Sequence, residues 1–145
     1  MNEVFVDPTT RLFAVCASIL VLKMSLTGHA TAVLRNLKGV FVSAEDYAFR
    51  GKAPRPPDEQ IERLRRAHRN DLESILPFLV VGLLAAKSGA LSYGVAWWLF
   101  VPYTVVRVLH TVVYGLGLQP WRSILFGIGD VALLATTVLL LITVI

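Results

Sequence analysis

Residues 62–78 read ERLRRAHRNDLESILPF, a charged segment followed directly by an apolar one. Four charged side chains recur there at intervals of three and four residues, so a helix places them on one face: Glu62, Arg66, Arg69 and Glu73. Residues 74–86 are predominantly apolar, and Asp58 has the residue type of an N-cap. These features predict one helix over residues 59–86, about 40 Å long, which can cross a bilayer and extend into the polar region.

The composition of the whole chain places this helix in a membrane bundle. The chain has 145 residues, of which 55% are hydrophobic and 17% charged, whereas a soluble domain has about 45–50% apolar and about 25% charged residues. We therefore predict an all-α integral membrane protein in which residues 1–145 form one domain, a four-helix transmembrane bundle. Its predicted spans are residues 12–34, 59–86, 95–114 and 121–145, with a polar loop over residues 36–57.

The placement of the charges excludes one function class and predicts an orientation. The formal net charge is +4, and most Lys and Arg residues lie between Arg35 and Arg69, interspersed with acids. Because this basic region lies between apolar spans, nucleic-acid binding is not expected. The loop after the first span and the turn after the third share one side of the membrane, and the positive-inside rule predicts that this side is cytoplasmic.

Two features near the amino terminus bear on processing and redox chemistry. Arg11 before an apolar stretch and the small-x-small pattern Ala30-Thr31-Ala32 are also found in signal peptides. Lys23 interrupts the stretch, so we predict a retained first span and keep a cleaved signal as the alternative. Cys16 is the single cysteine, which excludes a disulfide framework and a zinc or iron–sulfur site within one chain, and no metal site is predicted.

Ionisable residues within the spans are expected to converge at one membrane level. Span three carries Arg107, His110 and Tyr114 at helical spacing, and span four carries Arg122, Ser123, Phe126 and Asp130. Such residues are costly in a bilayer and usually face a partner or a cavity. The alternative is that they serve packing alone, with Arg66 and Arg69 snorkelling or paired to Glu62 and Glu73 on their own helix, and Asp130 paired to Lys23 or Arg107.

A cluster of this kind suits a small polyanion that also has an ammonium group. Arginine forks bind carboxylates in a bidentate manner, Glu73 offers a partner to an ammonium, and Asn70 both donates and accepts. Glutathione carries two carboxylates, one ammonium and a thiol. Its thiol reacts as the thiolate, and an arginine helped by a serine hydroxyl can lower its pKa from about 8.5.

Four segments strongly resemble the MAPEG family, the membrane-associated proteins of eicosanoid and glutathione metabolism: residues 62–78, Val21-Leu22-Lys23-Met24, Glu45-Asp46, and residues 107–114, RVLHTVVY. The similarity is greatest to the branch of microsomal glutathione transferases and prostaglandin E synthases. It implies a four-helix protomer, a homotrimer, and glutathione bound between neighbouring subunits.

The resemblance also assigns roles to individual residues. It implies that glutathione is contacted by Arg35, Arg69, Asn70, Glu73, His110 and Tyr114, and we add Arg66 and Phe126 to the binding set. It further implies that Arg122 stabilises the thiolate, that Ser123 assists it, and that Asp46 takes part in catalysis. Phe126 and Leu76 stand where the synthase has tyrosines, so the chain combines features of both enzymes.

The sequence therefore predicts a membrane glutathione transferase that attacks lipophilic electrophiles arriving through the lipid bilayer, with reduction of lipid hydroperoxides as a second activity. The endoplasmic reticulum and a bacterial inner membrane both remain open as its location. The alternatives are a glutathione-dependent isomerase of prostaglandin H2, a non-catalytic lipid-binding member of the family, and a small transporter.

Overall fold

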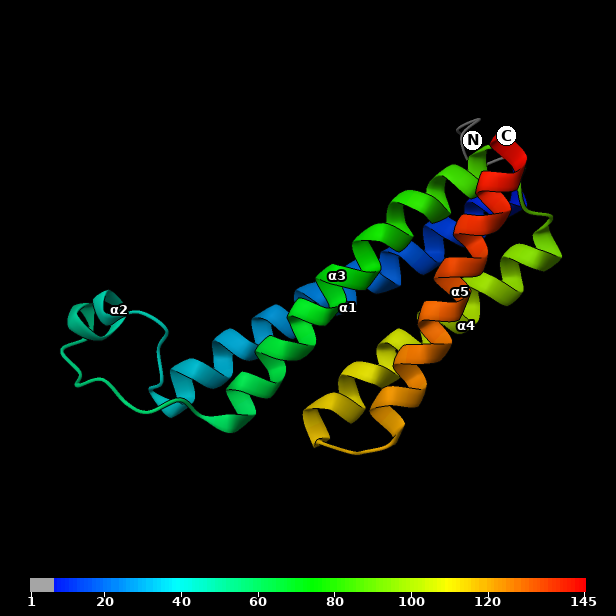
Figure 1. The fold of residues 1–145 in the computed structure, drawn as a ribbon. Coiled ribbons are helices and arrows are strands. Elements are labelled where there is room, and N and C mark those ends of the chain that lie inside the picture. The colour runs from blue at the N-terminus through cyan, green and yellow to red at the C-terminus, as the bar shows by residue number, and fades with distance from the viewer. Residues whose placement is uncertain (1–6) are drawn as a thin grey trace.

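The computed structural model describes residues 7–145, so residues 1–6 of the predicted domain lie outside the described part. All regular secondary structure in the described part of the chain is α-helical (Figure 1). Its five helices are α1 (Pro8–Lys38), α2 (Ala44–Phe49), α3 (Glu59–Lys87), α4 (Tyr93–Leu116) and α5 (Trp121–Val144). The four long helices coincide closely with the four predicted spans, and Asp58 caps α3 as predicted, accepting from the backbone N–H groups of Gln60 and Ile61.

The prediction of four helices needs one correction, because the loop after α1 contains the short helix α2. Ser43 caps this helix by accepting from the backbone N–H of Asp46 at 3.3 Å, and the acids in its first turn favour a helix N-terminus. Tyr47 is buried, and its hydroxyl accepts from the backbone N–H of Phe41 at 2.9 Å. Local capping and one buried tyrosine therefore fold a segment whose composition indicated only a polar loop.

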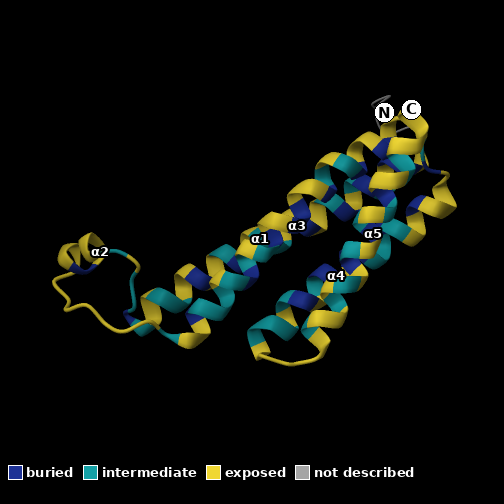
Figure 2. Ribbon diagram, in the orientation of Figure 1, coloured by how far each residue is buried: buried dark blue, intermediate teal, exposed yellow. Residues whose placement is uncertain are grey.

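Three of the helices, α1, α4 and α5, are long and apolar enough to cross a membrane. The second half of α3 is similarly apolar, but charged residues crowd its first half. Many large apolar side chains are exposed on the outer faces of the helices (Figure 2), among them Leu26, Val80, Trp98 and Ile142. A soluble protein does not expose so much apolar surface, so the chain is a membrane protein.

The helices are arranged as two neighbouring pairs (Figure 1). The long helices α1 and α3 run side by side, and α4 and α5 form a hairpin against them. The α2 loop and the α4–α5 turn lie toward one end, and the carboxyl terminus and the start of α1 lie at the other. This arrangement agrees with the predicted placement of the two connections on one side, although it does not fix which side is cytoplasmic.

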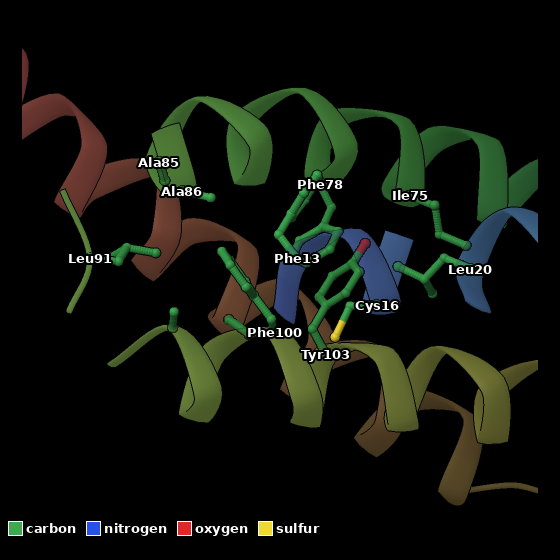
Figure 3. Close-up of a cluster of buried hydrophobic side chains, with 12 residues drawn as sticks. Phe13, Cys16, Leu20, Ile75, Phe78, Ala85, Ala86, Leu91, Phe100 and Tyr103 are labelled. Carbon is green, nitrogen blue, oxygen red and sulfur yellow. The ribbon is translucent and has the colours of Figure 1, made fainter. Parts of the chain in front are cut away.

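Aromatic packing holds the half of the bundle that lies toward the termini (Figure 3). Phe13 from α1, Phe78 from α3 and Phe100 and Tyr103 from α4 are buried together. The rings of Phe78 and Tyr103 stack at 3.9 Å between centroids, and Phe78 meets Phe100 edge-on at 5.5 Å. With the helices fixed here, their polar residues face one another in the other half of the bundle.

A buried ion pair joins α1 to α3 next to this core. Lys23 donates to Asp71, whose side chain is fully buried, and Thr111 of α4 donates to the other carboxylate oxygen at 3.4 Å. The packing alternative considered Asp130 as a partner of Lys23 or Arg107, and the described chain forms neither pair. Asp71 lies next to Asn70 on α3, so the ion pair fixes the helix turn that enters the site described below.

Candidate functional site

Six polar and aromatic side chains surround one pocket where α3, α4 and α5 meet. Its volume is about 280 Å³. The lining residues are Asn70 of α3, His110 and Tyr114 of α4, and Arg122, Ser123 and Phe126 of α5. Every one of them belongs to the set predicted from the sequence, and we refer to this site as the polar pocket. Three helices that are distant in sequence therefore bring their ionisable residues to one place.

Arg107 forms the buried base of the polar pocket. Its side chain is 1% exposed, and its Nη1 donates to the Asn70 side-chain oxygen at 3.3 Å. The guanidinium lies over the rings of Tyr103 and Phe126, at 5.4 and 5.2 Å from their centroids. Gly129 of α5 leaves room for it, because a Cβ there would lie 3.1 Å from Arg107 Nε. The sequence analysis had included Arg107 in the expected cluster of intramembrane charges but had given it no role in binding glutathione.

Two nitrogen atoms at this base have no hydrogen-bond partner within residues 7–145: Arg107 Nε and His110 Nδ1. The His110 ring is buried, with its centroid 5.6 Å from that of Tyr114 and 6.3 Å from that of Phe126. A buried polar group without a partner is costly, and native structures rarely leave one without a reason. The base of the polar pocket therefore offers polar atoms that a ligand can satisfy directly or through water.

Arg122 is held at the wall of the polar pocket by contacts that leave its charge unneutralised. Its guanidinium lies 4.7 Å above the centre of the Tyr114 ring. With its amide oxygen turned toward Arg122, Gln119 accepts from Nε at 3.1 Å and from Nη2 at 2.6 Å. Ser123 is the next residue, and its hydroxyl lies 3.4 Å from the Gln119 side chain. Gln119 is a site residue that the sequence analysis missed, since only its spacing of three from Arg122 could have indicated it.

The charge of the polar pocket is positive. In the described part of the chain, no carboxylate lies within ion-pair distance of Arg107 or Arg122. Asp71, which is next to Asn70 on α3, is already paired with Lys23. Two guanidiniums at a partly apolar, partly buried site favour an anionic ligand, because the local dielectric constant is lower than that of water.

Arg66 and Glu73 lie on the same face of α3 as Asn70 but do not line the polar pocket. Arg66, one turn toward the loop, donates through Nη2 to Glu59 at 2.9 Å and lies within electrostatic reach of Tyr114. Its partner is thus Glu59, and Glu62 pairs instead with Arg65 at 2.8 Å. Glu73, one turn deeper than Asn70, is exposed.

Arg35 and Arg69 line a different hollow, between α1 and α3. This arginine pocket has a volume of about 270 Å³. Its lining residues are Gly28, Thr31, Arg35, Arg65, His68, Arg69 and Leu72. Asp46 lies farther away, exposed on α2 in the loop (Figure 1). Within one chain, the fold therefore does not bring Arg35, Arg69 or Asp46 to the polar pocket.

Comparison with known proteins agrees with this geometry. The MAPEG family profile matches residues 13–142 of the chain. The chain belongs to the MAPEG family. It is 38% identical to human microsomal glutathione S-transferase 1 over 135 residues, which cover 89% of this chain and 86% of the relative. The bovine protein of that name is 40% identical over 134 residues, covering 88% and 83%.

A second group of MAPEG relatives has a different name. Human prostaglandin E synthase is 37% identical over 127 residues, which cover 86% of this chain and 82% of the relative. The chain is thus similar to both groups to nearly the same degree, as its mixture of sequence features predicted. Family membership accounts for the helical architecture and for the long apolar helices.

Proposed function

We propose that this MAPEG protein is a membrane glutathione transferase that activates glutathione for attack on lipophilic electrophiles. One observation carries the proposal: the Arg122 guanidinium, which has no carboxylate partner in the described chain, lines one pocket together with the Ser123 hydroxyl. A second guanidinium without such a partner, that of Arg107, packs against the lining residues Asn70 and Phe126. The names of the relatives support glutathione as the substrate. Reduction of lipid hydroperoxides by the same thiolate is proposed as a second activity.

The residues of the polar pocket fit glutathione in charge and in hydrogen-bonding capacity. Arg122 offers a fork to a carboxylate or thiolate, Asn70 offers an amide, and Tyr114 offers a hydroxyl. The unpartnered nitrogens of Arg107 and His110 can be satisfied by polar atoms of the ligand or by a bridging water. The exposed Glu73, on the same face of α3 as Asn70, is placed to pair with an ammonium group outside the pocket.

Arg122 and Ser123 are proposed to stabilise the thiolate. Glutathione supplies the thiol, which reacts only in its ionised form. Arg122 stabilises that anion by charge, and Ser123 donates a hydrogen bond to it. Each pKa unit by which the thiol is lowered needs about 1.4 kcal/mol of preferential stabilisation of the thiolate. One charged hydrogen bond at a partly buried site supplies about 1.5–3 kcal/mol, which lowers the pKa by about one to two units.

A homotrimer is proposed because one chain leaves the predicted binding set divided. Arg35 and Arg69 line the arginine pocket, and Asp46 lies on α2. If a neighbouring copy presents this surface to the polar pocket, the three residues complete a site between subunits. Chemical crosslinking of the purified protein tests this, and a species that remains monomeric at saturating crosslinker argues against it.

The proposed placement in the membrane follows from the charges of the connections. All four long helices span the bilayer, with the charged half of α3 reaching into the polar region on the side of the α2 loop. The loop side is cytoplasmic by the positive-inside rule, in the endoplasmic reticulum or a bacterial inner membrane. Glutathione then enters from the cytoplasm, and the electrophile enters from the bilayer.

The proposal is tested by conjugation of chlorodinitrobenzene with glutathione by the purified protein. We expect activity in the wild type and its loss in Arg122→Ala. Arg11→Ala, near the start of α1 and outside the polar pocket, serves as the control for removal of one positive charge. An inactive wild type, or a fully active Arg122→Ala variant, contradicts the proposal.

A second candidate is a glutathione-dependent isomerase of prostaglandin H2. It is favoured by the similarity to prostaglandin E synthase and by the consecutive Arg122 and Ser123. Phe126 weighs against it, because a phenyl ring at the polar pocket cannot donate the hydrogen bond that a tyrosine would. Product analysis with prostaglandin H2 decides between the two activities. The non-catalytic alternative does not explain why a lipid-binding protein would keep two unneutralised arginines.

A further inference from the structure

A third hollow lies under the α2 loop, apart from the polar pocket. This loop pocket has a volume of about 300 Å³ and is enclosed by the end of α1, the start of α3 and the loop between them. Its polar lining residues are Arg35, Ser43, Arg55, Glu62 and Arg65, and Phe41 and Tyr47 add aromatic surface. It lies beyond the α4–α5 turn along the molecule (Figure 1).

In the described part of the chain, two of the three arginines that line the loop pocket are held by hydrogen bonds, and the third is not. Arg55 donates through Nη1 to the carbonyl oxygen of Lys38 at 3.0 Å, and Arg65 donates to Glu62 at 2.8 Å. The Arg35 guanidinium has no hydrogen-bond or ion-pair partner in the described chain. Glu62 is the single acid in the lining, so three guanidiniums face one carboxylate and the pocket carries an excess positive charge.

The rest of the lining is apolar and stiff. The rings of Phe41 and Tyr47 meet edge-on at 5.2 Å, and the Tyr47 hydroxyl holds the backbone of Phe41. Pro54 and Pro57 form part of the wall, and proline fixes its own backbone conformation. A pocket with preformed apolar walls and a few convergent charged groups is typical of a small-molecule site.

We propose that the loop pocket is a second anion-binding site, for a small organic phosphate or carboxylate with an aromatic or apolar body. Arg35, Arg55 and Arg65 bind the anionic group, since guanidiniums match phosphate and carboxylate geometry. Ser43 donates a further hydrogen bond, and the ring of Phe41 packs against the apolar body. No residue of the polar pocket takes part, so the two sites are spatially separate.

The loop pocket is nevertheless coupled to glutathione, and this part rests on the proposed function. Arg35 and Arg65 line both the loop pocket and the arginine pocket, so they form the wall between the two hollows. An anion in the loop pocket engages Arg35 and withdraws it from glutathione. The ligand therefore raises the KM for glutathione and leaves kcat unchanged.

Phenyl phosphate is the probe, added to the full-length protein in non-ionic detergent and followed by isothermal titration calorimetry. We expect one site per chain, with affinity reduced about tenfold or more in Arg55→Gln and in Arg65→Gln, because each loses a charged hydrogen bond. Arg65→Gln keeps the hydrogen bond of Arg55 to the loop backbone, so loss of binding there is not a loop-folding effect. Arg63→Gln, which removes the same charge outside the loop pocket, is expected to bind normally.

Four outcomes decide the proposal. Absence of binding to the wild type overturns it, and so does binding that Arg122→Ala abolishes while Arg55→Gln retains, since the anion then occupies the polar pocket. In nanodiscs, weaker binding with phosphatidylglycerol than with phosphatidylcholine supports the site and identifies a lipid headgroup as its natural occupant. Equal binding in the two lipids supports a soluble ligand.

The two proposals fail separately. Normal glutathione conjugation without phenyl phosphate binding overturns the loop site and leaves the proposed function standing. Phenyl phosphate binding that depends on Arg55, in a protein with no conjugation activity, overturns the proposed function and leaves the loop site standing. In an active protein, phenyl phosphate is expected to raise the KM for glutathione in the wild type and not in Arg55→Gln, whose activity without the probe is unchanged.

Discussion

Arg107 on α4 and Asn70 on α3 are joined at the base of the polar pocket, where Arg107 Nη1 donates to the Asn70 side-chain oxygen at 3.3 Å. The bond connects a fully enclosed cation to a residue that lines the pocket. It also ties together two helices whose ionisable residues are far apart in sequence. Asn70 is therefore the neutral side chain that accepts the hydrogen bond of this guanidinium, which otherwise packs over the rings of Tyr103 and Phe126.

The first prediction concerns the replacement of Asn70. In Asn70→Leu, Arg107 loses its partner in the described chain, and an unsatisfied buried donor costs roughly 1–3 kcal/mol. We expect kcat/KM for glutathione to fall by about fivefold or more, measured by chlorodinitrobenzene conjugation. Asn36→Leu, on the exposed end of α1, is the matched control. Equal activity in the two variants would show that Asn70 does not position the site.

A second prediction concerns the ion pair between Lys23 and Asp71. Both side chains are buried, and removal of one partner leaves an uncompensated charge at a cost of about 3–5 kcal/mol. We expect a large drop in melting temperature for Lys23→Met and for Asp71→Leu, and a partial recovery in the double variant. Additive losses in this double-mutant cycle, followed by thermal unfolding in detergent, would argue against the pairing.

Glu59 provides a third prediction, because it holds two arginines, one of which, Arg66, lies within electrostatic reach of the pocket residue Tyr114. Its Oε1 accepts from Arg63 at 3.0 Å and from Arg66 at 2.9 Å. In Glu59→Gln, Arg66 is free to pair with a glutathione carboxylate, and we expect the KM for glutathione to fall about twofold, as for an exposed ion pair. High salt should abolish the effect.

The control for Glu59 is Glu62→Gln, which releases Arg65 instead and should leave this KM unchanged at low salt. A KM that rises in Glu59→Gln would show that Glu59 positions Arg66 for binding rather than competing for it.

The fourth prediction uses the residue that departs from the synthase pattern. Phe126 lines the polar pocket and contacts the Arg107 guanidinium. In Phe126→Tyr, a hydroxyl is added where glutathione can accept or donate a hydrogen bond. Such a bond contributes about 0.5–1.5 kcal/mol, so the KM for glutathione should fall by about twofold to tenfold in steady-state assays. An unchanged or higher KM would mean that the ligand does not reach this ring.

Much of the fold could be predicted because its determinants are local. Apolar run lengths and turn residues located the four long helices, and Asp58 marked the start of α3. Helix α2 could not be predicted in this way, because it depends on a serine cap and on the contact of Tyr47 with Phe41. Such a contact forms only once the loop has folded back on itself.

The candidate site could likewise be predicted only in part. Helical spacing correctly predicted which residues of α4 and α5 share a face, and six predicted residues meet at the polar pocket. Spacing does not determine which helices face each other, and so Asp71 was not recognised as the partner of Lys23. Glu59 is on the same helix as Arg66 but was missed, because only Glu62 and Glu73 were considered as partners for the arginines of that helix. Arg35 and Asp46 were assigned through resemblance alone, whereas Arg69 was also indicated by its helical spacing. One chain places none of the three at the polar pocket.

The central claim is that Arg122 lowers the pKa of the glutathione thiol. The most direct test is a pH titration of the ultraviolet absorbance of the thiolate bound to purified protein. We expect the wild type to titrate about one to two pH units below the value of about 8.5 for a free thiol, and Arg122→Ala to titrate near that free value. Identical titrations of the two proteins, with glutathione bound in both, would contradict the account.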